Sequence, residues 1–133
     1  MADETERKRL VLDYFERVNA GDVDGICKMF TPQARVEDPV GTGPVVGEEA
    51  IRAYFQRVVE EFGTQDTPGT LTGSQDDQHV AVGLRATIRN PQDPSGGRLA
   101  VNVTSVFRFD ASGLIEEMRA YWGATDVAPV DGA

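Results

Sequence analysis

The apolar residues change their spacing about halfway along the chain. In the first half they recur every three or four positions, which is the spacing of amphipathic helices. The pattern predicts helices over residues 5–20, 22–30 and 48–62. Gly21 is well placed to end the first helix, and Asp22 can cap the second.

In the second half apolar and polar residues alternate, as they do along strands with one buried face. Strands are predicted over residues 34–39, between the helices, and then over 70–73, 80–88, 99–109 and 114–122. The prolines and glycines between residues 90 and 97 indicate a hairpin loop. Helices followed by hairpin strands are typical of an α+β fold, in which one antiparallel-dominated sheet packs against segregated helices.

The chain is expected to form one domain over residues 1–125, followed by a loose tail over 126–133. A length of 133 residues suits one core and is short for two domains. No apolar run is long enough to span a bilayer, and the charged N-terminus lacks the core of a signal peptide. We therefore expect a soluble, cytoplasmic protein without a membrane partner.

The composition narrows the classes of ligand. A formal net charge of −9 argues against nucleic acid as a partner, because such proteins need a basic face. The single cysteine, Cys27, and the single histidine, His79, do not make a metal site. The glycines lie in turns and not in a phosphate-binding loop, so no cofactor is expected.

Asp38 is the first polar side chain expected on an inward face. Along residues 34–39, Ala34, Val36 and Asp38 share one face of the predicted strand. Glu37 falls on the outer face with Arg35, with which it can pair. An inward carboxylate is a candidate base, although an aspartate beside proline and glycine more often forms a turn or caps a helix.

Tyr14 and Ser105 also fall on apolar faces. Tyr14 lies on the apolar stripe of the first predicted helix, and Ser105 interrupts the inward residues of the strand over 99–109. Taken alone, each is more simply a core residue, the tyrosine with a satisfied hydroxyl. Together with Asp38 they match the needs of proton abstraction beside a carbonyl, which takes one base and donors for the oxyanion.

The sequence resembles the Δ5-3-ketosteroid isomerases (steroid delta-isomerases) of the nuclear-transport-factor-2-like, or SnoaL-like, superfamily. The resemblance covers nearly the whole chain and is carried by residues 14–22, 36–41, 47–55, 106–109 and 118–123. The Val-Glu-Asp-Pro motif with a tyrosine upstream is fairly specific, whereas Ala-Gly-Asp and Phe-Arg-Phe indicate the superfamily only. The resemblance implies a conical domain, in which a curved mixed sheet packs with three helices, and a homodimer.

The resemblance also implies an activity and a set of roles. The enzyme would move the double bond of a 3-oxo-Δ5-steroid to the Δ4 position through a dienolate, without a cofactor. Asp38 matches the general base of the family and Tyr14 its principal oxyanion donor. The residues expected to line the steroid pocket are Val18, Phe55, Leu84, Val103, Met118 and Trp122.

Ser105 is the main departure from the family pattern. It stands where the family has a protonated aspartic acid as second oxyanion donor, and a hydroxyl is expected to be a weaker donor. The indole N–H of Trp122 could supply a compensating donor. Phe30 and Phe55 take the places of tyrosines that support the donor in some members.

Two alternatives stay open beside steroid isomerisation. One is another reaction on the same scaffold, such as epoxide hydrolysis or polyketide cyclisation, because a fold does not fix function. Epoxide hydrolysis would need a second acid and an arginine beside Asp38, and the sequence shows no inward-facing pair of that kind. The other alternative is a non-catalytic module that binds a small apolar ligand or forms dimers.

Overall fold

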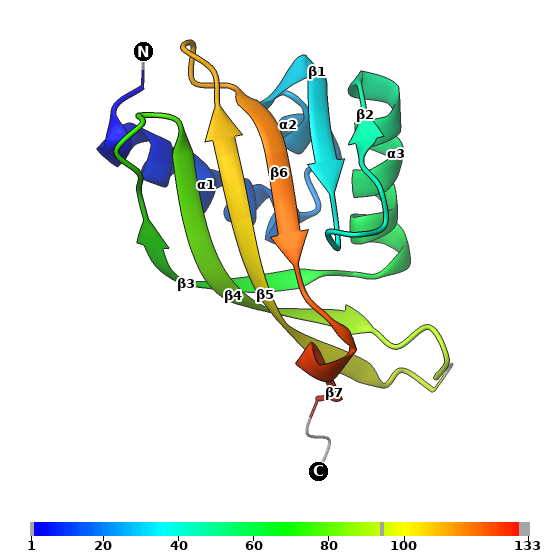
Figure 1. Ribbon diagram of the computed structural model, residues 1–133. Coiled ribbons are helices and arrows are strands. Elements are labelled where there is room, and N and C mark those ends of the chain that lie inside the picture. Colours follow the sequence, from blue (N-terminus) through cyan, green and yellow to red (C-terminus); the bar gives the residue numbers. More distant parts are fainter. Residues whose placement is uncertain (1, 94, 131–133) are drawn as a thin grey trace.

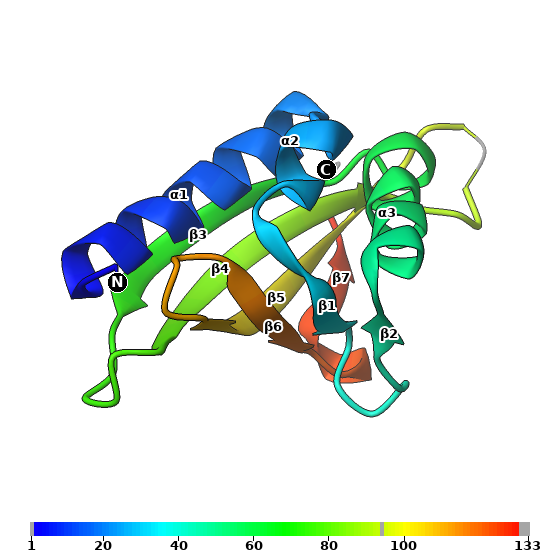
Figure 2. The same cartoon turned by 90° about the horizontal axis from the view of Figure 1, so that it is seen from above.

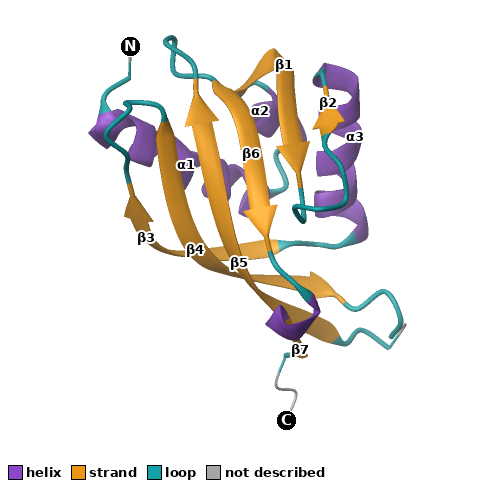
Figure 3. Cartoon of the chain, in the orientation of Figure 1, coloured by secondary structure: helices purple, strands orange, loops and turns teal. Residues whose placement is uncertain are grey.

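A computed structural model describes residues 2–93 and 95–130, which form helices and one large sheet (Figures 1 and 3). The helices are α1 (Glu4–Ala20), α2 (Val23–Cys27) and α3 (Glu48–Gln56), which continues as a π-helical turn over Arg57–Glu61, and a 3-10 turn over Ala124–Asp126. The strands are β1 (Phe30–Glu37), β2 (Val45–Val46), β3 (Gln65–Thr72), β4 (His79–Arg89), β5 (Arg98–Phe109), β6 (Ile115–Tyr121) and β7 (Val127–Pro129).

The strands make one curved sheet in the order β2-β1-β6-β5-β4-β3, with β7 added to β5. The β1–β6 pairing is parallel, and the other described pairings are antiparallel. The three α-helices lie on one face of the sheet, so that the sheet curves beneath them (Figure 2). This is the predicted α+β architecture of segregated helices against an antiparallel-dominated sheet.

Helix α1 follows directly from its sequence. The Asp3 carboxylate caps its first turn by accepting a hydrogen bond from the Glu6 amide at 2.8 Å. Gly21 ends it with φ of +72°, a left-handed conformation that glycine adopts without a Cβ penalty. Between these ends, residues at helical spacing turn one face toward the sheet: Val11, Tyr14, Phe15 and Val18 are buried.

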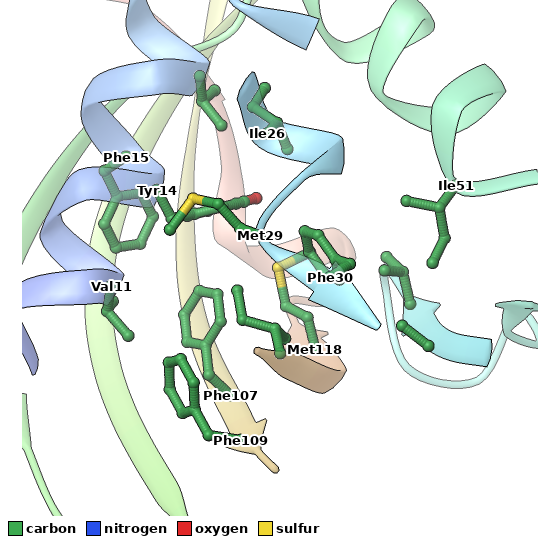
Figure 4. Packing of buried hydrophobic residues seen from close by; sticks show 14 of the residues in the cluster. Val11, Tyr14, Phe15, Ile26, Met29, Phe30, Ile51, Phe107, Phe109 and Met118 are labelled. Carbon is green, nitrogen blue, oxygen red and sulfur yellow. The ribbon is translucent and has the colours of Figure 1, made fainter. Parts of the chain in front are cut away.

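The core lies between this helix and the inner face of the sheet. Figure 4 shows side chains of α1, β1, β5 and β6 meeting there, including Phe30, Phe107 and Met118. The Tyr14 ring contacts Phe15 and Phe107 edge-on, with centroids 5.1 and 5.2 Å apart. Aromatic packing of this kind fixes the helix against the sheet and so sets the position of Tyr14.

Several predicted element bounds differ from the structure. Phe30 opens β1 where a helix was expected, and the last turn of the third predicted helix is π-helical. Strand β3 begins at residue 65, five residues before its predicted start. The tail expected to be loose from residue 126 instead continues as β7, which pairs with β5, while residues 131–133 of that tail lie outside the described residues.

Strand β3 was predicted too short because its inward residues are not apolar. Asp66 and Pro68 point inward in its first half, and the pairing with β4 then shifts between Pro68 and Leu71. A shift of this kind breaks the alternation that identifies a strand.

Within residues 2–93 and 95–130, no helix is long and apolar enough to cross a membrane.

Candidate active site

A cavity of about 580 Å³ opens between the inner face of the sheet and the helices α1 and α3. Most of its wall is apolar, and β4 and β5 contribute residues such as Leu84, Ala86, Val101 and Val103 to it. This volume is in the usual range for a small-molecule site. The polar side chains in this wall are therefore the candidates for chemistry.

Asp38 lies in the wall directly after β1, as its position on the strand predicted. Trp122 Nε1 donates a hydrogen bond to its Oδ1 at 2.8 Å. The Tyr54 hydroxyl donates a short hydrogen bond to Oδ2. Both carboxylate oxygens therefore have donors, and each oxygen keeps a lone pair that can accept a further hydrogen bond.

Two expectations around Asp38 are corrected by these contacts. The Trp122 indole was considered as a compensating oxyanion donor, yet its one N–H is used by Asp38. Glu37 faces away as predicted, but its partner is not Arg35. It accepts hydrogen bonds from the Gly41 and Gly43 amides, at 2.8 and 3.2 Å. Both bonds lower the pKa of Glu37, and the bond from Gly41 has the larger effect.

Tyr54 lies on α3, where its ring packs against the hydrophobic core. This ring packs on Phe55, with centroids 4.8 Å apart, while its hydroxyl reaches Asp38. Burial raises the pKa of Tyr54 well above its usual value, and the charge of Asp38 adds to the rise. Tyr54 is thus a permanent donor at neutral pH. A tyrosine at the edge of an apolar stripe is the only sequence signal for it.

Tyr14 and Ser105 both line the cavity, so the structure brings together all three residues predicted as catalytic. Tyr14 is buried in the core apart from its cavity face. Burial raises its pKa well above the usual value, and the charges of Asp66 and Asp38 contribute further. Ser105 is buried on β5, as its position on the strand predicted.

The six residues expected to line the pocket divide into two groups. Leu84, Val103, Met118 and Trp122 do line the cavity. Val18 and Phe55 do not. They are almost fully buried in the core, because their helix faces pack against other side chains and not against the open space.

Asp66 is a second acid in the cavity wall, and the sequence analysis missed it. Its backbone is held by Asn19 at the end of α1, which accepts from the Asp66 amide at 2.7 Å and donates to its carbonyl at 2.8 Å. Burial raises the pKa of the Asp66 carboxyl to about 7, and the charge of Asp38 adds to the rise. Near neutral pH Asp66 can therefore carry a proton, and it lies in the same cavity wall as Asp38.

The cavity also contains Arg57, from the π-helical turn after α3. The expectation that no second acid and no arginine face the same space as Asp38 is therefore wrong. It failed because Asp66 lies before the predicted start of its strand. The helical pattern of α3, for its part, gave no sign of the π-turn that presents Arg57.

These residues place two carboxyl groups and two hydroxyl groups in the wall of one apolar cavity. Two carboxyl groups in unlike surroundings can act as a proton acceptor and a proton donor, and two hydroxyl groups can support a developing negative charge. Among the described residues, no three His, Cys, Asp or Glu side chains come together in a way that could hold a metal ion.

Comparisons with known proteins place this geometry in a family. The epoxide hydrolase LasB from Streptomyces lasalocidi is 38% identical over 148 aligned positions, which cover 98% of this chain. The chain spans only about half of that relative's length, 52%. The solved structure of SalBIII, an epoxide hydrolase/cyclase-like enzyme studied for pyran ring formation in the polyether salinomycin, superposes with a TM-score of 0.93. It is 42% identical, over 98% of this chain and 100% of that one.

A steroid Delta-isomerase from Nocardioides simplex is 30% identical over 122 residues, covering 92% of this chain and 94% of that enzyme. The family expected from the sequence is thus represented, but at lower identity than the two epoxide enzymes. The family model of the SnoaL-like domain matches residues 11–118, most of the chain. The chain therefore belongs to the SnoaL-like domain family, whose fold it shares with enzymes of at least two activities.

Proposed function

We propose that this chain opens epoxides by paired acid–base catalysis, with Asp66 as the acid and Asp38 as the base. One observation carries the proposal: two carboxyl groups share one apolar cavity in unlike surroundings. Both oxygens of Asp38 accept hydrogen bonds from side-chain donors, whereas burial raises the pKa of the Asp66 carboxyl to about 7. The similarity to the epoxide hydrolase LasB and to the epoxide hydrolase/cyclase-like enzyme SalBIII supports epoxides as the substrate class.

In the proposed reaction the Asp66 carboxyl gives its proton to the epoxide oxygen as the carbon–oxygen bond breaks. A hydroxyl nucleophile attacks the carbon and passes its proton to Asp38. The new carbon–oxygen bond replaces the broken one, and no oxidant or reductant is needed. Asp38 ends protonated and Asp66 ionised, and proton exchange with water through the open cavity restores both. A donor with a pKa near the working pH suits this task.

Tyr14 and Ser105 would assist at the leaving oxygen. Both line the same cavity, and the raised pKa of Tyr14 keeps its hydroxyl protonated at neutral pH. Hydrogen bonds to an oxygen that gains charge in the transition state lower the barrier more than bonds to the neutral substrate do.

The nucleophile in this proposal is a hydroxyl group of the substrate itself, and the product is a cyclic ether. The apolar wall favours a folded organic chain over bulk water. A tethered hydroxyl also has a far higher effective concentration at the epoxide than an untethered nucleophile.

Incubation of the protein with a hydroxy-epoxide in ¹⁸O-labelled water tests both parts of the proposal. Cyclisation gives a product with the mass of the substrate and no label, whereas hydrolysis adds one labelled water. Labelled diol as the main product would show that water, and not the hydroxyl group of the substrate, is the nucleophile. Asp66→Asn is the matched control and should open the epoxide no faster than the uncatalysed reaction. The same uncatalysed rate with the wild-type protein would overturn the proposal.

Steroid isomerisation is a second candidate, supported by the shared cavity of Asp38, Tyr14 and Ser105 and by the steroid Delta-isomerase relative. The two reactions place different demands on Asp66. Epoxide opening needs its proton, whereas isomerisation uses one base and oxyanion donors. Isomerisation of a 3-oxo-Δ5-steroid that survives Asp66→Asn, together with no epoxide opening, would favour the second candidate.

A further inference from the structure

Arg57 is the one cationic side chain among the described residues that line the cavity. The same wall contains Asp38 and Asp66, and the protein as a whole carries a formal charge of −9. A cation in this position has to be explained, because the residues on which the proposed chemistry rests do not use it.

Arg57 does not serve as the counter-ion of either cavity acid. Its recorded ion pair is with Glu61, one helical turn further on, where Nε donates to Oε2 at 3.1 Å. Neither Asp38 nor Asp66 lies within salt-bridge distance of it among the described residues. Glu61 therefore orients the guanidinium, and among these residues the two Nη groups have no hydrogen-bond acceptor.

The local backbone presents Arg57 in a defined way. Arg57 begins the π-helical turn after α3, and π-turns are rare and frequent at functional sites. Its Cζ lies 5.6 Å from the centre of the Phe62 ring, which also lines the cavity. The guanidinium is thus held between a carboxylate and an aromatic face, while the side chain stays 63% exposed.

We propose that Arg57 is an anion-binding subsite at the mouth of the cavity, and that it takes a carboxylate at one end of the ligand. An arginine with free Nη donors matches a carboxylate in shape and charge. An anionic ligand entering this acidic protein would otherwise find no cationic side chain in the described cavity wall to attract it. Because it rests on the proposed function, the inference names the substrate class as an epoxide on an apolar chain that ends in a carboxylate.

Binding tests the subsite without any catalysis. Trp122 is the only tryptophan and lines the cavity, so its fluorescence reports occupancy directly. Wild-type protein is expected to bind octanoate more tightly than octan-1-ol. Arg57→Gln should weaken octanoate binding roughly tenfold, leaving octan-1-ol unchanged, and Arg57→Lys should retain most of the preference.

Arg52→Gln is the matched control for the loss of one positive charge. Arg52 lies on α3, pairs with Asp24 at 2.6 Å and does not line the cavity, so its substitution should leave octanoate affinity unchanged. No preference for octanoate in the wild type, or equal octanoate affinity in Arg57→Gln, overturns the inference. An equal loss in Arg52→Gln also overturns it, because the effect would then come from overall charge.

Turnover separates this inference from the proposed function. With an ω-epoxy fatty acid and its methyl ester, Arg57→Gln should raise KM for the acid roughly tenfold and leave kcat and the ester unaffected. If the protein opens the epoxide of the acid and of the methyl ester with equal KM, the proposed reaction stands and the Arg57 subsite does not. Octanoate selectivity without epoxide opening would keep the subsite and overturn the reaction.

Discussion

Two adjacent carboxylates, Glu37 and Asp38, meet opposite surroundings at the end of β1. Glu37 binds the amides of a surface loop, whereas Asp38 faces the cavity between Tyr54 and Trp122. We expect Asp38→Asn to lower turnover by roughly a hundred- to ten-thousandfold, because the amide cannot take a proton. Glu37→Gln is the control and should keep full turnover. Loss of turnover in Glu37→Gln, with turnover kept in Asp38→Asn, would show that Asp38 is not the base.

Tyr54 is expected to act through Asp38 and not on the substrate. Tyr54→Phe removes one of the two donors, so the Asp38 side chain is less firmly held. Turnover should fall roughly tenfold with KM little changed, because the base is positioned less well for proton transfer. A rise in KM with unchanged turnover would show that Tyr54 acts on substrate binding and not through Asp38.

The candidate residues divide according to how well a sequence pattern can show them. Asp38 continues the alternation of β1 by one residue and Ser105 lies within β5, so the inward position of both follows from alternation. Tyr54 cannot be told from a core residue by its spacing, because its ring packs against Phe55 as an apolar side chain would. Only its hydroxyl points away from the core and reaches Asp38. Asp66 lies in a stretch where alternation fails altogether, and no local pattern could show that it faces the same space as Asp38.

At the level of elements, the irregular part of β3 runs close to the backbone of β4. Gly69 lies between Pro68 and Leu71, where the pairing with β4 shifts, and a Cβ there would sit 2.9 Å from the Gly83 carbonyl oxygen. We expect Gly69→Ala to lower the free energy of unfolding by about 1–3 kcal/mol, because backbone must move. Urea denaturation measures this change.

Gly83→Ala is the matched control on the neighbouring strand. A Cβ at Gly83 meets no atom within 4 Å, so the substitution should change stability by less than about 0.5 kcal/mol. Equal effects of the two substitutions would mean that backbone freedom, and not close approach, is the reason for glycine in β3.

The same irregularity explains which elements the sequence could predict. The helix α1 and the hairpin of β4 and β5 have unbroken periods, and their observed bounds lie within a residue of the predicted ones. The π-turn after α3 keeps the helical spacing of its apolar residues, so the sequence cannot tell it from ordinary helix, whereas the first half of β3 has no apolar alternation to reveal it. Arg57 and Asp66 lie in these two elements.

For the whole molecule, the change of period along the chain is sufficient to predict the α+β fold, because it is a property of the complete sequence. Activity is not predictable in this way. One scaffold is shared by LasB, SalBIII and the steroid Delta-isomerase relative. What separates the candidate reactions is one acid, Asp66, that the regular pattern does not contain.

Asp66 also links the cavity to the stability of the whole protein. Its pKa is about 7 in the folded state and 3.8 for an unperturbed side chain, so between these values the folded protein holds a proton that the unfolded chain has lost. Stability should therefore fall as the pH rises from 4 to 7 and then level off. The full cost above pH 7 is at most about 4 kcal/mol.

Asp66→Asn removes this titration and should stabilise the protein in a pH-dependent way. The gain over wild type should be small at pH 4 and largest at pH 8, as measured by urea denaturation at pH 4, 6 and 8. Glu16→Gln, an exposed substitution on α1, removes a carboxylate without burial and should give no such trend. A gain for Asp66→Asn that does not change with pH would show that the carboxyl is ionised throughout. The donor role of Asp66 in epoxide opening would then lose its physical basis, because a group that is already ionised has no proton to give.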